Sequence, residues 1–327
     1  MSTTVVTQAP ATDGAGGPRP IRFAALGDST TLGIGDPMPD GRWRGWAALL
    51  ASALSGPRDV RLHNLAVSGA RVDDVADGQL AAALRLRPDL ASVLVGANDA
   101  LRGRFDVAAI GSALSRCVAA LCRHGAVVLT ARLPEPGRML RLPASLARPL
   151  ARRINAINAI TDGIAVRFGT VHVDLTDHPG VYDRPMWSID RLHPSERGHR
   201  LLARCFADQL ATRGHPVPTP PALEPEHAMP TRGAEARWML TKGTRWMMHR
   251  CTDLLPGLTA MAAAEWWFGV LGTANSFDEH VGREVAAALA RIGDRAGLPP
   301  CTYCSPSGNG DRAAEFARTC GSSAGAD

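Results

Sequence analysis

The fold is decided first by the stretch IRFAALGDST at residues 21–30, where an apolar run ends abruptly in small and polar residues. Residues 21–26 have the length and apolar content of a buried strand. Gly27 permits a sharp turn directly afterwards, because glycine has no Cβ. Ligands of open α/β sheets bind outside the carboxyl ends of the strands. The stretch therefore indicates an α/β sheet with Ser29 on its reactive edge.

Further along the chain, short apolar runs alternate with longer segments of helical periodicity. This alternation is typical of repeated β-α units around a parallel sheet. We predict strands at residues 21–26, 60–66, 90–95, 126–131 and 171–174. We predict helices at residues 43–54, 72–84, 106–124, 144–168 and 195–211. Together they predict a three-layer α/β/α sandwich built on a five-stranded parallel sheet.

Small and polar residues follow three of the predicted strands, at positions where a strand or helix core would be apolar. They are GDST at 27–30, VSGA at 67–70 and GAND at 96–99. Because parallel strands end at one edge of the sheet, we expect these three segments to meet there.

A serine hydroxyl is a poor nucleophile until a base removes its proton. The candidate base lies in SIDRLHPSERGH at residues 188–199, in a loop before the last predicted helix. Asp190 and His193 are three residues apart there, so the carboxylate can orient the imidazole. The imidazole is then free to point its other nitrogen at Ser29, as in a Ser-His-Asp triad.

Acyl transfer also requires donors that stabilise an oxyanion in the transition state. Asn98 offers a side-chain amide, and Gly69 offers a backbone N–H that a substrate can approach closely. The backbone N–H of Ser29 is a third candidate donor. We therefore predict an oxyanion hole formed by Ser29, Gly69 and Asn98.

In these motifs the chain resembles the SGNH/GDSL hydrolase family. The blocks are Gly27-Asp28-Ser29, Asn64 through Gly69, Gly96-Ala97-Asn98-Asp99 and Asp190-Arg191-Leu192-His193-Pro194, in the family's order. The resemblance covers about residues 21–213 and implies a hydrolase domain with Ser29 as nucleophile. Thr30 departs from the family pattern, which often has leucine there. Lipid esters, acetylated sugars, aryl esters and thioesters are all substrates that the resemblance allows.

Two carboxylates beside the motif residues are expected to support the site. We expect Asp28 to fix the turn by accepting backbone N–H groups, and Asp99 to be a buried structural partner. His199 is expected to be structural as well. No metal or cofactor is expected. The single C-x-x-C at Cys301 and Cys304 lacks the second pair that a zinc site requires.

The composition is that of a globular protein, with 327 residues, 45% hydrophobic and 20% charged. The net charge of +5 is carried by scattered arginines without a basic and aromatic stripe, so nucleic acid is not an expected partner. Residues 1–20 are predicted to be disordered, and they lack the apolar centre of a secretory signal. We therefore expect a cytoplasmic location and reduced cysteines. The arginine-rich composition with few lysines is typical of bacterial chains.

The C-terminal third departs from the β-α pattern. Residues 214–230 are proline-rich and predict a linker or a wrap over the surface, and residues 231–327 predict a mainly helical extension. The helices are expected at residues 234–250, 257–274 and 279–296, and the first is basic and contains tryptophan. We expect them to pack on the hydrolase domain or on another subunit. Membrane contact is not expected, and the oligomeric state is left open.

Three functions remain open on these residues. The first is a serine esterase or acylhydrolase that cleaves a small-molecule or lipid ester through an acyl-enzyme on Ser29. The second is an acyltransferase that passes the same acyl group to an acceptor other than water. The third is a binding protein with a relic site, which the intact Ser29, Asp190 and His193 disfavour.

Overall fold

The computed structural model describes residues 19–102, 105–227, 233, 257, 259–267, 270–271 and 274–294. The predicted lead-in before residue 19, the basic helix predicted at residues 234–250, and the residues after Asp294 lie outside this part.

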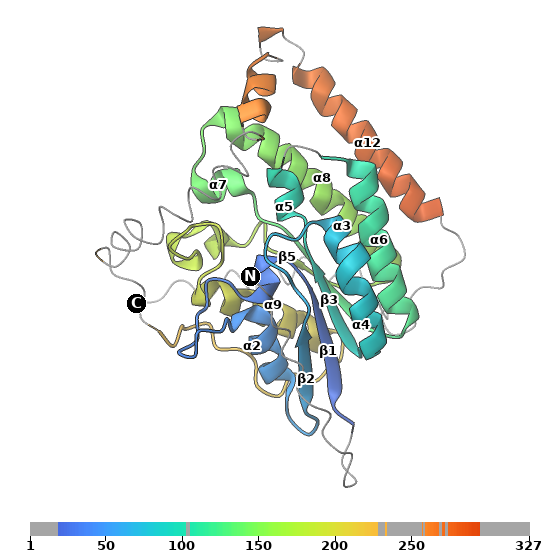
Figure 1. The fold of residues 1–327 in the computed structure, drawn as a ribbon, viewed down its shortest axis with the longest axis vertical. Helices are drawn as coiled ribbons and strands as arrows, with labels where there is room; N and C mark the ends of the chain where they lie inside the picture. The colour runs from blue at the N-terminus through green and yellow to red at the C-terminus, as the bar shows by residue number, and fades with distance from the viewer. Residues whose placement is uncertain are drawn as a thin grey trace.

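The described chain contains one five-stranded parallel sheet, which confirms the predicted fold class (Figure 1). Its strands are β1 (Ile21–Gly27), β2 (Val60–Asn64), β3 (Leu90–Leu94), β4 (Val127–Arg132) and β5 (Val171–Asp174). Their order is β2-β1-β3-β4-β5, so the chain reverses its direction of sheet growth between β1 and β3. Ligand sites of open α/β sheets lie outside the strand ends at such a switch point. The residues after β1 and β3 are therefore the natural place for a site.

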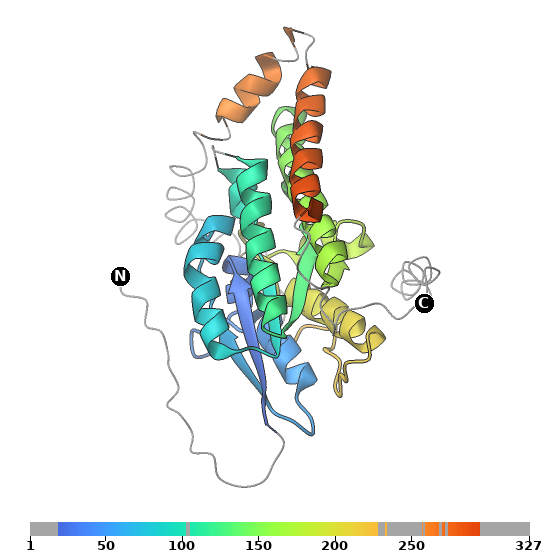
Figure 2. The same ribbon diagram turned by 90° about the vertical axis from the view of Figure 1, so that its right-hand side faces the viewer.

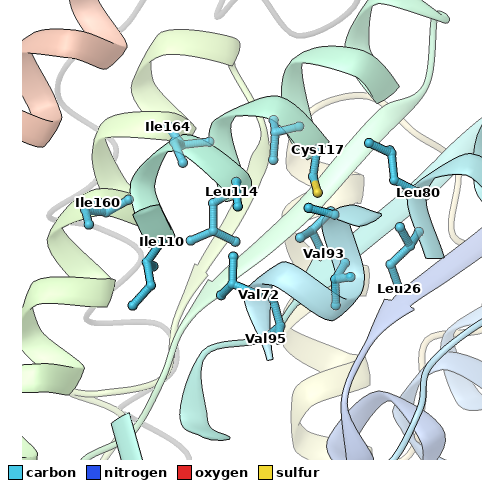
Figure 3. Packing of buried hydrophobic residues seen from close by; sticks show 14 of the residues in the cluster. Leu26, Val72, Leu80, Val93, Val95, Ile110, Leu114, Cys117, Ile160 and Ile164 are labelled. Atoms are coloured by element: carbon cyan, nitrogen blue, oxygen red, sulfur yellow. The ribbon is translucent and has the colours of Figure 1, made fainter. Parts of the chain in front are cut away.

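Helices cover both faces of the sheet. One face packs against α2 (Gly45–Leu54) and α9 (Glu196–Thr212), with Trp46 and Phe206 fully buried between the layers. The other face packs against α6 (Val107–Arg123) and α8 (Ala144–Phe168), as Figure 3 shows for Ile110, Leu114, Ile160 and Ile164. The remaining helices are α1 (Ser29–Leu32), α3 (Val72–Asp74), η1 (Val75–Gln79), α4 (Leu80–Leu86), α5 (Ala97–Leu101), α7 (Pro136–Leu140), η2 (Pro179–Tyr182), η3 (Arg184–Met186) and α12 (Ala274–Asp294).

Several predicted element boundaries differ from those of the structure by a few residues. The helix predicted at residues 72–84 is α3, the π-helix η1 and α4 in succession. The helix predicted from residue 43 begins at Gly45, because Trp43 forms a β-bridge with Pro37. The strand predicted to residue 66 ends at Asn64, whose side chain donates to the carbonyl of Thr31 and accepts from the N–H of Ala66. The last helix begins after Ser195, which caps it, and continues to Thr212.

The C-terminal helix α12 is part of the main hydrophobic core. It packs along α6 and α8, on the face of the molecule that Figure 2 turns toward the viewer. Its Ala288 and Ile292 are buried in the same cluster as Ile160 and Ile164. A Cβ on Gly163 would overlap the side chain of Leu289, so α8 and α12 approach closely at that point. The hydrophobic core of the sandwich therefore includes a helix that the β-α pattern alone does not contain.

The proline-rich stretch lies on the surface over α2 and α9 as far as it is described. The N–H of Thr219 donates to the carbonyl of Ala53, and Glu196 accepts from the backbone N–H of both Glu226 and His227. Arg200 also donates to the carbonyl of Ala222. Residues 214–227 therefore follow the surface instead of leaving it.

Candidate active site

The turn at residues 27–29 places Ser29 at the carboxyl end of β1. Asp28 caps helix α1 by accepting from the N–H of Thr30 at 3.0 Å, and Ser29 is the first helical residue. Gly27 has a φ of 153°, and a Cβ there would clash with the carbonyl oxygen of Leu94 on β3. Only glycine fits this close approach, so the turn places the serine at the edge of the sheet while remaining tightly packed.

The side chain of Gln79 fixes the backbone of this turn at Gly27. Its Oε1 accepts from the N–H of Gly27 at 2.8 Å, and its Nε2 donates to the carbonyl of Gly27 at 2.9 Å. The side chain is buried and comes from the π-helix η1. Sequence reasoning missed this residue, because a glutamine 52 positions from Gly27 has no motif of its own. It is a positioning residue, since it contacts the turn and not the serine hydroxyl.

The structure brings Ser29, His193 and Asp190 together in one hydrogen-bonded line. His193 Nε2 lies 2.9 Å from Ser29 Oγ, and His193 Nδ1 lies 2.6 Å from Asp190 Oδ2. Ser29 and His193 are both buried, with 7% and 4% of their surface exposed. The distances allow the imidazole to accept the serine proton while Asp190 accepts from the protonated Nδ1.

Asp190 is held ionised by the loop that carries it. Its Oδ1 accepts from Ser188 Oγ at 2.6 Å and from the N–H groups of Leu192 and His193 at 3.0 and 3.1 Å. Burial opposes the charge, but these bonds and the His193 ring lower the pKa of Asp190 to about 2. Arg191, between the two triad candidates, has a positive φ of 58°. The backbone of this loop therefore turns sharply to bring Asp190 and His193 together.

The candidate oxyanion donors Gly69 and Asn98 already take part in hydrogen bonds of their own. Gly69 has a φ of 82°, and its carbonyl accepts from Arg102 at 3.1 Å. Asn98 Nδ2 donates to the carbonyl of Ala70 at 3.1 Å and to Asp28 Oδ2 at 3.3 Å. Both amide hydrogens of Asn98 are thus engaged in this structure. An oxyanion would compete with Asp28 for the amide hydrogen of Asn98 that forms the longer of the two bonds.

Asp28 and Asp99, the two carboxylates beside the motif residues, are both buried. Burial raises the pKa of Asp28 to about 6, although its bond from Thr30 and the nearby His193 oppose that rise. Burial also raises the pKa of Asp99 to about 6, against the bond that it accepts from the N–H of Val72 at 3.1 Å.

His199 lies in the core below the site. Its Nδ1 accepts from the N–H of Trp46 at 3.3 Å, and its Nε2 faces the carbonyl of Ile34 at 3.0 Å. Burial lowers its pKa to about 4, so the ring is neutral at neutral pH. These contacts fix one tautomer and join α9 to the chain that follows α1.

A cavity of about 130 Å³ opens beside Ser29 and His193. It runs past the ends of β3, β4 and β5 and is bounded on one side by α9. Most of its lining is apolar and includes Leu94, Leu133, Met139, Val181, Leu201 and Leu202. The sequence motifs did not indicate this cavity, because its walls come from residues scattered over several segments of the chain.

One cluster resembles a metal site by residue type. Glu196, Glu226 and His227 have ligand atoms close together. Arg44 and Arg200 contact the same carboxylates, however, with Arg44 Nη2 at 2.8 Å from Glu196 and Arg200 Nε at 2.9 Å from it. The cluster is therefore explained as an ion-pair network that fastens residues 226 and 227 to α9.

Comparison with protein families identifies the chain. The model of the GDSL-like lipase/acylhydrolase family matches residues 25–201, which is more than half of the sequence. The chain belongs to this family. The match begins within β1, ends within α9, and includes the segments that carry Ser29, Gly69, Asn98, Asp190 and His193. This GDSL-family chain is accordingly a hydrolase of ester bonds.

Solved structures to which the chain is similar include several hydrolases. An α/β hydrolase from the metagenome of Lake Arreo, Spain, is 23% identical, with 58% of this chain and 95% of that chain covered and a TM-score of 0.48. A lipase/acylhydrolase from Enterococcus faecalis is 20% identical, with coverage of 64% and 100% and a TM-score of 0.48. An acetylxylan esterase from Geobacillus stearothermophilus is 18% identical, with coverage of 58% and 94% and a TM-score of 0.47. No curated protein matches the chain.

Proposed function

We propose that this GDSL hydrolase is a serine esterase that cleaves an acyl ester through a covalent acyl-enzyme on Ser29. The observation that carries the proposal is the 2.9 Å contact between Ser29 Oγ and His193 Nε2, continued at 2.6 Å from His193 Nδ1 to Asp190. Nucleophile, base and orienting carboxylate in hydrogen-bond contact are the arrangement that activates a serine hydroxyl.

In the acylation step, Ser29 Oγ attacks the ester carbonyl carbon while His193 Nε2 takes the hydroxyl proton. The carbonyl oxygen becomes an oxyanion, which the N–H groups of Ser29 and Gly69 and the amide of Asn98 stabilise. The ester C–O bond then breaks, and the imidazolium gives its proton to the departing alkoxide. Asp190 stays ionised throughout, because its pKa is about 2.

In the deacylation step, His193 Nε2 takes a proton from water as the water oxygen attacks the acyl carbon. Collapse of the second oxyanion breaks the bond to Ser29 Oγ, which recovers the proton, and a carboxylic acid leaves. An acyltransferase would follow the same route with an alcohol in place of water. Measuring products in the presence of added alcohols separates the two reactions, since transfer yields a new ester.

The acyl group is the apolar part of the proposed substrate. The cavity beside Ser29 is lined by Leu133, Met139, Val181 and other apolar side chains. Burying an apolar chain there contributes about 25 cal/mol for each Å² removed from water. An acetyl group would leave most of a cavity of about 130 Å³ unfilled. We therefore favour esters with an acyl chain longer than acetyl and leave the alcohol unassigned.

The test combines active-site labelling with a panel of nitrophenyl esters of increasing acyl length. Ser29→Ala should lower ester turnover by roughly 10⁴-fold or more and abolish labelling by a fluorophosphonate. Ser52→Ala, at an exposed serine on α2, is the control and should behave like the native protein. Turnover or labelling that survives Ser29→Ala would remove the acyl-enzyme from the proposal.

The chain-length profile tests the cavity separately. The native protein should prefer acyl chains longer than acetyl, and Met139→Trp should shift that preference toward shorter chains by narrowing the cavity. An unchanged profile would show that the acyl chain lies elsewhere.

A further inference from the structure

Two adjacent tryptophans stand exposed on the described part of the C-terminal region. Trp266 and Trp267 have 64% and 55% of their surface exposed, and their rings contact each other with centroids 6.4 Å apart. Val270 and Leu271 follow with 62% and 53% exposed. These four residues, which we name the tryptophan face, form the densest group among the large exposed apolar side chains of the described residues.

The tryptophan face is fastened to the hydrolase domain. Glu265, directly before it, pairs with the guanidinium of Arg152 on α8, with Arg152 Nη2 donating to Glu265 Oε1 at 3.0 Å. Met261, one turn earlier in the helix of residues 259–267, is buried. Figure 1 shows this helix, drawn in orange, beside the amino end of α8 and at the same end of the molecule as α7. The exposed rings therefore have a fixed position on the domain.

Exposed arginines lie on α7, directly after α7, and at the start of α8. Arg138, Arg141 and Arg148 are all exposed. No described carboxylate lies within ion-pair distance of them, and the sequence from residue 136 to 161 contains no aspartate or glutamate. Arg148 is one helical turn from Arg152, which holds Glu265 beside the tryptophan face. Basic and aromatic side chains thus occupy one end of the molecule.

The same end reaches the proposed acyl cavity. Met139 on α7 lines the cavity, between the exposed Arg138 and the arginine at position 141. The guanidinium carbon of Arg138 lies 3.7 Å from the centroid of the Tyr182 ring, so that α7 packs against η2. A surface that contacts Arg138 and Arg141 therefore lies close to the part of the cavity wall that Met139 forms.

We propose that this end of the protein binds peripherally to the surface of an anionic lipid bilayer. Tryptophan is favoured at the boundary between headgroups and acyl chains, because its ring is apolar and its N–H is polar. Arginine is attracted to anionic headgroups, and each one near such a surface strengthens binding roughly fivefold. The charge and the aromatic content both match an anionic lipid surface.

A second copy of the chain is a poorer occupant of this surface. A twofold contact brings the same patch of both copies together, so the exposed arginines of one copy would face those of the other.

No described helix is long and apolar enough to cross a membrane. The proposed peripheral contact differs from the sequence-based expectation, which was that membrane contact is unlikely.

Sedimentation with vesicles tests the proposal on the full chain. The protein should bind vesicles that contain phosphatidylglycerol, bind those of phosphatidylcholine alone more weakly, and be released by salt. The double substitution Trp266→Ser with Trp267→Ser should reduce binding by about tenfold or more. So should Arg141→Glu combined with Arg148→Glu. Turnover of a soluble short-chain ester should be unchanged, since none of these residues touches Ser29, His193 or Asp190.

Two controls keep this result independent of the proposed chemistry. Val166→Ser, at a side chain that is 86% exposed elsewhere on α8, should leave vesicle binding unchanged. Ser29→Ala should bind vesicles normally, so failure of the esterase proposal and failure of lipid binding are distinguishable. Equal sedimentation of the native and double-tryptophan proteins would overturn the inference. A stable dimer that the tryptophan substitutions dissociate, without vesicle binding, would also overturn it.

Discussion

Gln79 pairs with both backbone polar groups of Gly27, at 2.8 and 2.9 Å, and so fixes the residue two positions before Ser29. The amide of glutamine matches a peptide group in reverse, because it offers one acceptor and one donor at the same spacing. The carbonyl of Gly27 also accepts from the N–H of Val67 at 3.2 Å, whereas the N–H of Gly27 donates to Gln79. The turn that carries Ser29 is therefore held by a side chain from η1.

Substituting Gln79 should reduce turnover without weakening substrate binding. Gln79→Leu leaves the buried N–H of Gly27 without its acceptor, which costs roughly 1–3 kcal/mol of stability. A displaced serine is expected to lower kcat by about tenfold to a hundredfold, with KM little changed. Gln209→Leu, on α9, is the control. A folded Gln79→Leu protein with native kcat would show that the turn holds itself.

The Asp190–His193 contact predicts a tautomer effect. In Asp190→Asn, an amide that faces Nδ1 can donate its N–H there, which would leave the proton on Nε2, toward Ser29. We expect kcat to fall by roughly 10⁴-fold with the fold intact. Ser188→Ala removes just one donor to Asp190, whose Oδ1 keeps the N–H groups of Leu192 and His193. Its effect should stay within about tenfold. Similar losses in both variants would contradict a specific role of the carboxylate.

The next prediction concerns Asn98. Its side-chain amide donates to both Asp28 and the carbonyl of Ala70. Asn98→Ala should lower kcat by about 10²- to 10³-fold if the amide stabilises the oxyanion. KM should change little, since the hydrogen bond from the Asn98 amide to the oxyanion forms fully in the transition state alone. The measurement is steady-state kinetics on one nitrophenyl ester, with thermal unfolding to verify folding. Native kcat in a stable Asn98→Ala protein would leave the backbone donors as the sole oxyanion hole.

The sequence was sufficient for the sheet and for the motif residues, and physical reasons explain what it missed. Ser29 and Asn98 follow β1 and β3, whose parallel pairing forces the ends of the two strands to one edge. The π-helix η1 could not be predicted from the sequence. Its residues VADGQ are compatible both with the 3.6-residue turn of an α-helix and with the wider turn of a π-helix. The ion pairs of Glu196 with Arg44 and Arg200 depend on tertiary packing, so no local pattern shows that they secure residues 226 and 227.

The buried carboxylate of Asp99 predicts a pH-dependent stability. Burial raises its pKa from 3.8 to about 6, so the native state holds a proton more tightly than the unfolded chain does. Its contribution to stability is therefore greatest below pH 3.8 and is lost as the pH rises toward 6. Asp99→Asn should keep the bond from the N–H of Val72 and stabilise the protein by roughly 1–3 kcal/mol above pH 6.

Below pH 3.8 the advantage of the Asp99→Asn protein should vanish, because both proteins then carry an uncharged side chain at this position. Urea unfolding at a series of pH values measures the difference. A constant difference across the series would show that the substitution acts through packing. The opposite slope would show that Asp99 is stabilised as a carboxylate in the folded protein.

The last prediction concerns helix α12, whose Ile292 is buried in the core shared by α6 and α8. If α12 is an integral layer, Ile292→Ala should lower the free energy of unfolding of the whole sandwich by about 2–5 kcal/mol. Arg291→Ala, at the exposed neighbouring position, should change it by less than about 0.5 kcal/mol. The transition should remain single and be reported equally by circular dichroism and by loss of ester turnover. A separate early transition without loss of turnover would show instead that α12 is an accessory, and a chain ending at residue 213 would then be expected to remain folded and active.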